Sequence, residues 1–345
     1  ALEDAKIPFL VRKIDVQLLN RQENRSLDPY VRDCCAYGIN MIGINPDLLY
    51  RIPGWLSYDE WARRYNIGYW FWELPNFPVE WRYAEYLVDE VWVNTDFVAK
   101  AVAQRFIKVV KIPFAVSFED PGPRFNRQYF GLPESGFVFL FSYDFNSSSA
   151  RKNPQAVIEA FKRAFPDRDT PVCLVLKSIN GEQNPEALSK LKASLCDDPR
   201  IAFVDDYLST EEMRGLLNTA DAYVSLHRSE GLGLGMAESM YLGKPVIATA
   251  YSGNMEFMTA DNACLVPYTL VPVQQGEYPY NSGQVWADPD VAAAAAWMVR
   301  LVYEPTVGRE IGVRAADHVR LFHSRDAMSA AIKERIAQIS AGICV

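Results

Sequence analysis

Short apolar segments alternate with amphipathic helical patterns along most of the chain. Helical patterns occupy the intervals between apolar segments, as at residues 154–164 and 210–219. Such alternation is typical of parallel β-sheets that helices cover on both faces. The sequence therefore predicts an α/β fold class. The strands that it predicts are residues 38–44, 66–70, 90–94, 137–142, 172–177, 201–204, 222–226 and 245–249.

A segment rich in proline, glycine and charge divides these strands into two groups. We interpret residues 118–133 as a linker between an N-terminal domain, residues 1–117, and a C-terminal domain, residues 134–322. Residues 323–345 form a final helical segment, expected to cross back to the N-terminal domain. In this architecture ligands bind at the carboxyl ends of strands, so a cleft between the domains is the expected binding site.

The beginning of the chain departs from this pattern. Residues 1–7 resemble the end of a helix, and residues 9–13 resemble a strand. A complete domain of this kind normally opens with a strand and a glycine-rich turn, whereas the first glycine is Gly38. We therefore expect the N-terminal domain to lack its first strand and loop in this numbering.

Composition and charge narrow the class of protein. With 345 residues, of which 49% are hydrophobic, the chain can bury two cores. A formal net charge of −8 argues against a partner nucleic acid, which normally requires a basic surface. The cysteines show no Cys-x-x-Cys spacing, and no apolar run or secretory signal indicates membrane insertion. We expect a cytoplasmic protein whose membrane contact, if any, is peripheral and at the inner face.

The run Glu-Gly-Leu-Gly-Leu-Gly-Met-Ala-Glu at residues 230–238 carries the clearest chemical signal. It follows the predicted strand 222–226, and residues 236–242 contain no helix breaker, so the run should turn a strand into a helix. Backbone amides and the positive end of a helix dipole converge at such a turn. Glycines there let a phosphate or a sugar approach the backbone closely.

Two carboxylates, Glu230 and Glu238, frame this run. They would flank a bound group and accept hydrogen bonds from sugar hydroxyls. Glycine-rich turns by themselves are weak signals, because tight turns and dinucleotide folds also use them. The pattern predicts a site for an anion that carries hydroxyls, and the alternative is a turn that only packs closely.

The spacing Glu-x7-Glu around the glycines resembles the signature of retaining GT-B glycosyltransferases of family 4. The resemblance implies two Rossmann-like domains that face each other across a cleft. It also implies that Glu230 faces the donor sugar and that Glu238 binds the ribose hydroxyls. The loop residues that would hold the sugar and diphosphate are Gly231, Leu232, Gly233, Leu234 and Gly235.

Residues 66–81 and 88–99 are similar to a bacterial branch of this family that builds surface polysaccharides. Many relatives place a histidine over the donor sugar at this point, whereas this chain has Trp72 and Glu73. The resemblance makes Glu73 a candidate catalytic residue beside aromatic rings that could stack on a sugar. The alternative is that the aromatic residues are core and Glu73 is a charge at a helix start.

Basic residues follow the predicted strand 137–142. Relatives commonly neutralise the diphosphate with an arginine and a lysine six residues apart. Lys152 matches the lysine and is a candidate catalytic residue, but Asn146 occupies the arginine position. Arg151 is expected to compensate, and Lys177 at a strand end is another candidate. Alternatively, these cations are solvated surface residues.

His227 ends the strand that leads to Glu230. Near a diphosphate its proton affinity should rise, so that it donates to a phosphate or sugar oxygen. The alternative is a histidine satisfied by the backbone at a strand end. Residues 249–256 resemble the family's second glycine-containing loop, in which Ser252 and Gly253 would line the cleft.

Two further patterns concern ligands. Residues 267–290 contain several aromatic side chains, which could recognise carbohydrate or bury an insertion. No Asp-x-Asp metal pattern follows a suitable strand, and we interpret Asp288 to Asp290 as a helix cap. We expect no metal and no cofactor, with the diphosphate stabilised by loop amides and Lys152.

The function that the resemblance implies is transfer of a hexose from a nucleoside diphosphate sugar with retention of configuration. UDP-hexose is preferred as donor over GDP-mannose, and the acceptor is a polysaccharide or a lipid-linked oligosaccharide. One alternative is a GT-B nucleotide-sugar epimerase. Another is a noncatalytic nucleotide-sugar-binding module of a polysaccharide synthesis complex.

Overall fold

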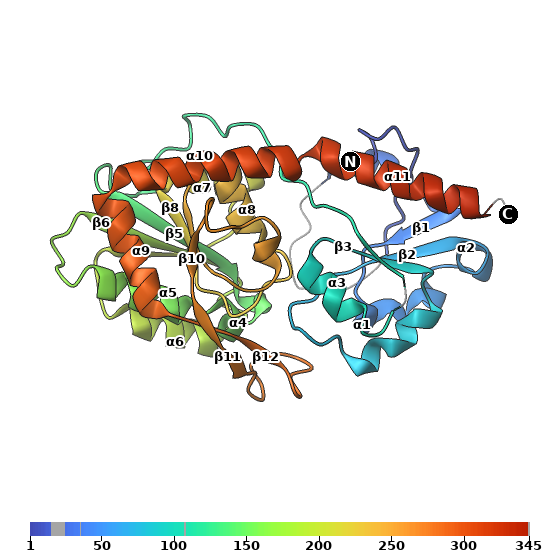
Figure 1. Cartoon of the computed structure of the whole chain (residues 1–345), viewed down its shortest axis with the longest axis horizontal. Coiled ribbons are helices and arrows are strands. Elements are labelled where there is room, and N and C mark those ends of the chain that lie inside the picture. Colours follow the sequence, from blue (N-terminus) through green and yellow to red (C-terminus); the bar gives the residue numbers. More distant parts are fainter. Residues whose placement is uncertain (15–24, 35, 107, 344–345) are drawn as a thin grey trace. The chain divides into compact units, whose positions relative to one another are not determined.

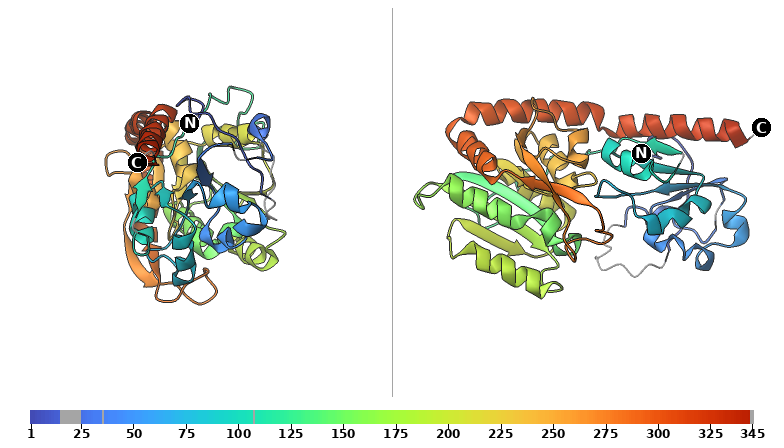
Figure 2. Two further views of the ribbon diagram at one scale, coloured as in Figure 1. Left: turned by 90° about the vertical axis from the view of Figure 1, so that its right-hand side faces the viewer. Right: turned by 60° about the horizontal axis from the view of Figure 1, so that its bottom comes forward.

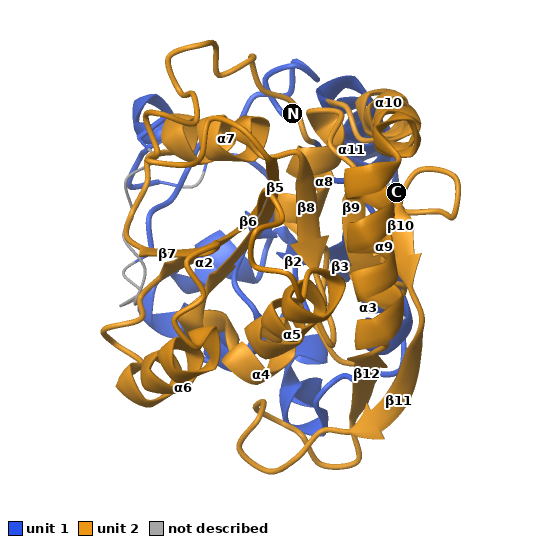
Figure 3. Cartoon of the chain, turned by 90° about the vertical axis from the view of Figure 1, so that its left-hand side faces the viewer, with its two compact units in different colours: residues 1–72, 76–115, 325–345 blue, residues 73–75, 116–324 orange. Residues whose placement is uncertain are grey.

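The structure, a computed structural model, describes residues 1–14, 25–34, 36–106 and 108–343. It divides into two compact units (Figure 3). The first unit contains Ala1–Trp72, Asn76–Ala115 and Arg325–Val345. The second contains Glu73–Pro75 and Val116–Ser324, so that it includes residues 118–133, which we expected to link two domains.

The first unit is built on a four-stranded parallel sheet in the order β1-β2-β3-β4 (Figure 1). Three of these strands coincide with predicted ones, whereas β4 is too short to give a recognisable apolar pattern. The strands are β1 (Ile39–Ile42), β2 (Tyr65–Tyr69), β3 (Glu90–Val93) and β4 (Val109–Lys111). The helical segments are η1 (Asp28–Tyr30), α1 (Pro46–Leu49), η2 (Ile52–Gly54), α2 (Tyr58–Trp61), η3 (Val79–Tyr86), α3 (Asp96–Val102) and α11 (Arg325–Ile343).

Helix α11 belongs to the first unit although it follows the second unit in sequence. Its Ile332 and Ile339 pack in one buried cluster with Ile67 of β2 and Trp92 of β3. Figure 2 shows this helix, in red, beside the sheet of the first unit. The final segment thus completes a core formed by the N-terminal half of the chain.

Two expectations for the beginning of the chain are wrong. Residues 1–7 form turns rather than a helix, and residues 9–13 form no strand. The latter segment contributes only an isolated bridge between Val11 and Val31. Short apolar patterns do not distinguish these states, because isolated helices and unpaired strands of this length gain too little without tertiary partners.

The second unit contains a six-stranded parallel sheet in the order β10-β9-β8-β5-β6-β7 and a separate hairpin of β11 and β12. Its strands are β5 (Phe137–Asp144), β6 (Val172–Ile179), β7 (Ile201–Asp205), β8 (Ala222–Ser225), β9 (Val246–Thr249), β10 (Cys264–Val266), β11 (Tyr268–Pro272) and β12 (Val285–Pro289). Its helical segments are η4 (Phe145–Ser147), α4 (Ser149–Lys152), α5 (Pro154–Ala164), α6 (Pro185–Leu195), α7 (Thr210–Thr219), α8 (Leu234–Tyr241), η5 (Gly253–Glu256), α9 (Val291–Tyr303) and α10 (Pro305–Phe322).

The strand order of the second unit creates a switch point beside β5. The chain passes from β5 to β6 and β7 on one side and returns to β8 on the other side. In open α/β sheets, the loops that leave such neighbouring strands diverge and form the usual ligand site. The loop after β5 leads to α4, and the loop after β8 contains the run from Glu230 to Glu238.

Candidate active site

The segments after β5 and β8 are held together by hydrogen bonds. The Asn153 side chain donates to the carbonyl of Leu226 at 3.0 Å, and the Arg228 amide donates to the carbonyl of Arg151 at 2.8 Å. Ser148 and Asn153, at the two ends of α4, have φ values of 67° and 56°. Left-handed conformations at non-glycine residues are uncommon and cost energy, so their presence on both sides of α4 marks a specifically shaped turn.

Glu230 lies between two cations that this turn supplies. Its Oε2 atom is 3.1 Å from Nη1 of Arg151, and its Oε1 atom accepts a hydrogen bond from Nζ of Lys152. Burial alone would raise the pKa of Glu230, but Lys152 and Arg151 outweigh burial and lower the pKa to about 2. Glu230 is therefore ionised throughout the physiological pH range.

The two cations differ in what else they contact. Arg151 is buried and also donates to the carbonyls of Ser229 at 2.9 Å and Ser147 at 3.2 Å. Its donors thus hold Glu230 and the surrounding backbone. The side chain of Lys152 is 19% exposed, against 5% for Arg151. Burial lowers the pKa of Lys152, whereas Glu230 opposes that shift. Lys152 therefore has the better access to a bound anion.

The glycine-rich run turns into α8 as the sequence predicts. Gly233 has a φ of 90° and caps the helix, which begins at Leu234. Because the first residues of a helix have no intrahelical acceptor for their amides, Leu234 and Gly235 present N–H groups at this end. Gly231 is buried and Leu232 half-buried. The turn therefore offers backbone donors and a helix dipole to an anion.

Ser252 and Gly253 support this turn from the next loop. The Glu230 amide donates to Oγ of Ser252 at 2.8 Å, and the Gly253 amide donates to the carbonyl of Glu230 at 2.8 Å. A Cβ atom on Gly253 would lie 2.1 Å from the carbonyl oxygen of Gly231, so only glycine fits there. Both residues, which we expected to line a cleft, contact the backbone of the Glu230 loop.

Glu238 lies in α8 and is half-buried. Within the described ranges its carboxylate has no hydrogen-bond or ion-pair partner, unlike that of Glu230. Burial raises the pKa of Glu238, and the charge of Arg214 partly opposes this shift. A half-buried acceptor without a protein partner is suited to the hydroxyls of a ligand.

Glu73 is grouped with the second unit and joins the same cluster. The Tyr278 hydroxyl donates to its Oε2 atom at 2.6 Å, and the Ser229 hydroxyl donates to its backbone carbonyl. Trp70 and Trp72 are buried core residues, as the alternative interpretation states, whereas Phe71 between them is exposed. The sequence indicated Tyr278 only as one aromatic residue in a tract, because nothing local pairs it with Glu73.

Lys177 is not part of this cluster, contrary to prediction. It is buried, and its ammonium donates to the carbonyls of Ser178, at 2.6 Å, and Asp206. Burial lowers the pKa of Lys177. Its strand, β6, lies on the other side of β5 from β8, and the backbone after β7 engages its charge. Its position at a strand end could not reveal which loop it would contact.

His227 is a fully buried residue rather than a phosphate ligand. Its Nε2 atom is 3.2 Å from the carbonyl of Tyr251 and 3.1 Å from Oδ1 of Asn254, and its Nδ1 atom is 3.0 Å from Oγ of Ser225. Because a carbonyl only accepts, Nε2 carries the proton and Nδ1 accepts from Ser225. Burial lowers the pKa of His227, and its contacts fit the alternative of a histidine whose hydrogen bonds are satisfied within the protein.

Three further observations concern Asp290, metal sites and membrane spans. Asp290 caps α9 by accepting from the amides of Ala292 and Ala293, which confirms its interpretation as a helix cap. Across the ranges that the structure covers, no three His, Cys, Asp or Glu side chains cluster as metal ligands. No helix there is long and apolar enough to cross a membrane.

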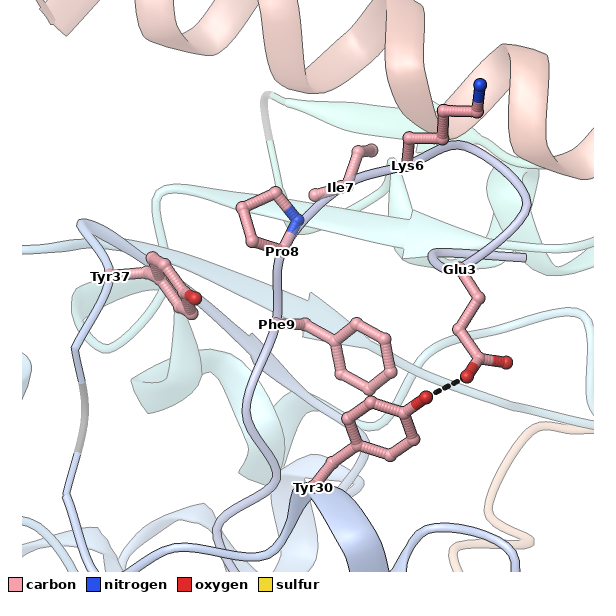
Figure 4. Close-up of a pocket in the computed structure, with 7 residues that line it drawn as sticks. All are labelled: Glu3, Lys6, Ile7, Pro8, Phe9, Tyr30 and Tyr37. Carbon is pink, nitrogen blue, oxygen red and sulfur yellow. Dashed lines mark hydrogen bonds between the residues drawn. The ribbon is translucent and has the colours of Figure 1, made fainter.

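A hollow of about 490 Å³ occurs in the first unit and contains none of the predicted site residues (Figure 4). In it the ring of Phe9 stacks on Tyr30, whose hydroxyl donates to Glu3. We place the candidate site at the charged cluster of the second unit, because the predicted residues converge there. The residues that line the hollow are Glu3, Lys6, Ile7, Pro8, Phe9, Tyr30 and Tyr37.

One family model matches a large part of the second unit. Residues 124–269 match the family model described as glycosyl transferases group 1. The matched residues include the turn with Arg151 and Lys152 and the run from Glu230 to Glu238. No curated protein matches the chain significantly.

Solved structures are similar over both units of this chain. HepE of Anabaena, in complex with UDP and glucose, is 18% identical with a TM-score of 0.65, over 88% of this chain and 78% of HepE. Sucrose-phosphate synthase of Thermosynechococcus elongatus is 16% identical (TM-score 0.66), over 89% and 74%. A Rickettsia africae glycosyltransferase is 15% identical (TM-score 0.67), over 98% and 86%. At these identities the similarity establishes the fold, an α/β fold of the GT-B type.

Proposed function

We propose that this protein transfers a hexose from a nucleoside diphosphate sugar to a saccharide acceptor with retention of configuration. The observation that carries this proposal is the ionised Glu230, held by Arg151 and Lys152 beside the glycine turn that begins α8. The family match of residues 124–269 and the UDP and glucose in the HepE structure support it. UDP-hexose is the preferred donor over GDP-mannose.

Each part of the site has a role in this reaction. The amides of Leu234 and Gly235, together with the dipole of α8, stabilise the diphosphate as it leaves. Lys152 adds a positive charge there, so that neither a metal nor a cofactor is required. Glu238 accepts hydrogen bonds from the ribose hydroxyls, and the carboxylate of Glu230 faces the donor sugar.

The acceptor attacks the face from which the diphosphate departs, and a leaving phosphate oxygen takes its proton. The new glycosidic bond therefore forms without a protein nucleophile. The acceptor is a polysaccharide or a lipid-linked oligosaccharide, and the reaction takes place in the cytoplasm or at the inner face of a membrane.

The donor site is tested with a thermal-shift panel of UDP, GDP, dTDP and ADP and their sugar conjugates, with and without magnesium. A ligand that binds only the native state raises the unfolding temperature as its concentration increases. We expect one base to shift the wild-type protein without magnesium, and Glu238→Ala to abolish the shift. Glu159→Ala, which removes an exposed carboxylate of α5, should retain it.

The outcomes separate the parts of the proposal. No shift with any nucleotide would overturn the donor site, and an unchanged shift in Glu238→Ala would overturn the role of Glu238. NMR spectroscopy of reactions with donor alone then distinguishes a transferase from an epimerase, which would convert the donor to an isomer of equal mass, or hydrolyse it, without an acceptor.

A further inference from the structure

The aromatic tract at residues 267–290 folds as the hairpin of β11 and β12, and the hairpin is attached to the candidate site. The Ser148 hydroxyl donates to the carbonyl of Glu277 at 2.7 Å, and the Ala287 amide donates to the carbonyl of Arg228 at 2.9 Å. Ser148 precedes α4, and Arg228 precedes Glu230. The hairpin therefore contacts both segments that form the charged cluster, and Figure 3 shows it as part of the second unit.

Tyr278, in the loop of this hairpin, reaches the cluster itself. Its hydroxyl donates to Oε2 of Glu73 at 2.6 Å, and its ring centroid lies 5.7 Å from the guanidinium carbon of Arg151. Burial and the neighbouring Glu73 raise the pKa of Tyr278, so the hydroxyl keeps its proton and remains a donor. Glu73 is thus held at its carboxylate by Tyr278 and at its backbone by Ser229.

Glu230 and Glu73 differ in how many of their carboxylate oxygens remain available to accept a hydrogen bond. Both oxygens of Glu230 are engaged by cations. In the part of the chain that the structure describes, Oε1 of Glu73 has no hydrogen-bond or ion-pair partner. A carboxylate with one oxygen fixed and the other open is an acceptor of defined orientation, which suits recognition of a hydroxyl.

We propose that Tyr278 is a positioning residue that holds Glu73 by Oε2, so that Oε1 accepts a hydroxyl of the transferred hexose. This inference rests on the proposed function and assigns the hairpin to recognition of the sugar. In this arrangement the nucleotide part of the donor does not contact Tyr278 or Glu73. Loss of the tyrosine hydroxyl should therefore weaken binding of a nucleotide sugar while leaving binding of the nucleotide alone intact.

The test compares Tyr278→Phe with Tyr268→Phe by titration calorimetry with UDP and with UDP-glucose. Tyr268 is a matched control, since it lies in β11 of the same hairpin and its hydroxyl has no hydrogen-bond partner in the described structure. We expect Tyr278→Phe to weaken UDP-glucose binding roughly tenfold and to change UDP binding less than twofold. Tyr268→Phe should change neither.

A double-mutant cycle with Glu73→Gln shows whether Tyr278 acts through Glu73. We expect Glu73→Gln alone to give the same loss selective for the sugar, and Tyr278→Phe to add little to it. Additive losses, or equal losses for UDP and UDP-glucose, would overturn the positioning role. Thermal unfolding of each variant monitors its folding, and Glu73→Gln supplies the test if Tyr278→Phe does not fold.

Failure of this inference differs from failure of the proposed function. Wild-type protein that binds UDP-glucose while Tyr278→Phe binds it equally well would overturn only the role of Tyr278. If the wild type binds GDP-mannose instead, the same comparison uses GDP and GDP-mannose. Wild-type protein that binds no nucleotide sugar would overturn both.

Discussion

Glu90 in the first unit and Glu230 in the second are both buried carboxylates paired with cations, and the pKa of each is lowered to about 2. Their surroundings differ. Glu90 accepts hydrogen bonds from Trp92 at 2.6 Å, Tyr65 at 2.8 Å and Arg335. These partners come from β3, β2 and α11, and Lys108, just before β4, adds an ion pair at 3.3 Å. Regular elements thus supply most of the contacts of this charge.

Glu230 instead depends on irregular segments. Its cations come from the turn at α4, which is flanked by left-handed residues, and its backbone is supported by Ser252, whose φ is 77°. Backbone strain concentrates where function requires a particular geometry, whereas a charge satisfied by regular elements usually serves the fold. We infer that Glu90 stabilises the first unit and that Glu230 serves the reaction, although their pKa values are alike.

The largest expected effect is on turnover in Glu230→Gln. If Glu230 faces the donor sugar as we propose, removing its charge should lower the transfer rate by roughly 10²- to 10³-fold, comparable to the loss of one preorganised electrostatic group in other active sites. Steady-state rates with the donor chosen by the thermal-shift panel measure it. If this variant transfers sugar at the wild-type rate, Glu230 has no role in the reaction and the contrast with Glu90 is wrong.

The next effect is on stability in Glu90→Gln. A glutamine amide keeps one acceptor oxygen but loses the charge and the second acceptor that hold the half-buried Arg335, and we expect the free energy of unfolding to fall by about 3 kcal/mol. Urea unfolding at neutral pH measures it. Glu85→Gln, which breaks the ion pair of this half-buried carboxylate with the exposed Arg82, is the control and should cost under about 1 kcal/mol. Reduced nucleotide affinity in folded Glu90→Gln would contradict a purely structural role.

The same comparison has a pH dependence. The pKa of Glu90 is lowered from 4.5 to about 2, because Arg335, Trp92 and Tyr65 together outweigh the opposing effect of burial. Its stabilisation is therefore complete above pH 4.5 and is lost as the pH falls from 4.5 towards 2. The difference in unfolding free energy between wild type and Glu90→Gln should shrink across this window. A constant difference would show that the charge is not responsible.

The smallest effect is expected for Lys152→Ala. Lys152 supplies one charge beside several backbone donors, so UDP affinity should fall by about tenfold, or about 1.4 kcal/mol. Calorimetry measures it, with Lys190→Ala, an exposed lysine of α6, as the control. Equal affinities in both variants would mean that the amides of α8 hold the diphosphate without Lys152.

Local patterns were sufficient for much of the fold. Residues 154–164 and 210–219 coincide with α5 and α7, and eight predicted strands occur as β1–β3 and β5–β9. The glycine turn at residues 230–238 was also predictable. Periodicity and turn chemistry act over a few residues, so they can be read directly from neighbours in the chain. The sequence did not predict the three-residue strands β4 and β10, because a segment of three residues is too short to show the hydrophobic pattern of a strand.

The sequence by itself determined the fold class, the glycine turn and the two glutamates that frame it. Only the tertiary structure decided that Arg151 holds Glu230, that Tyr278 reaches Glu73, and that Lys177 and His227 are bound within the second unit. Glu73 and Tyr278 are 205 positions apart. Their contact depends on the path of the hairpin, and the contact of Arg151 with Glu230 depends on the strand order, which places β8 beside β5. Neither is encoded in any local pattern.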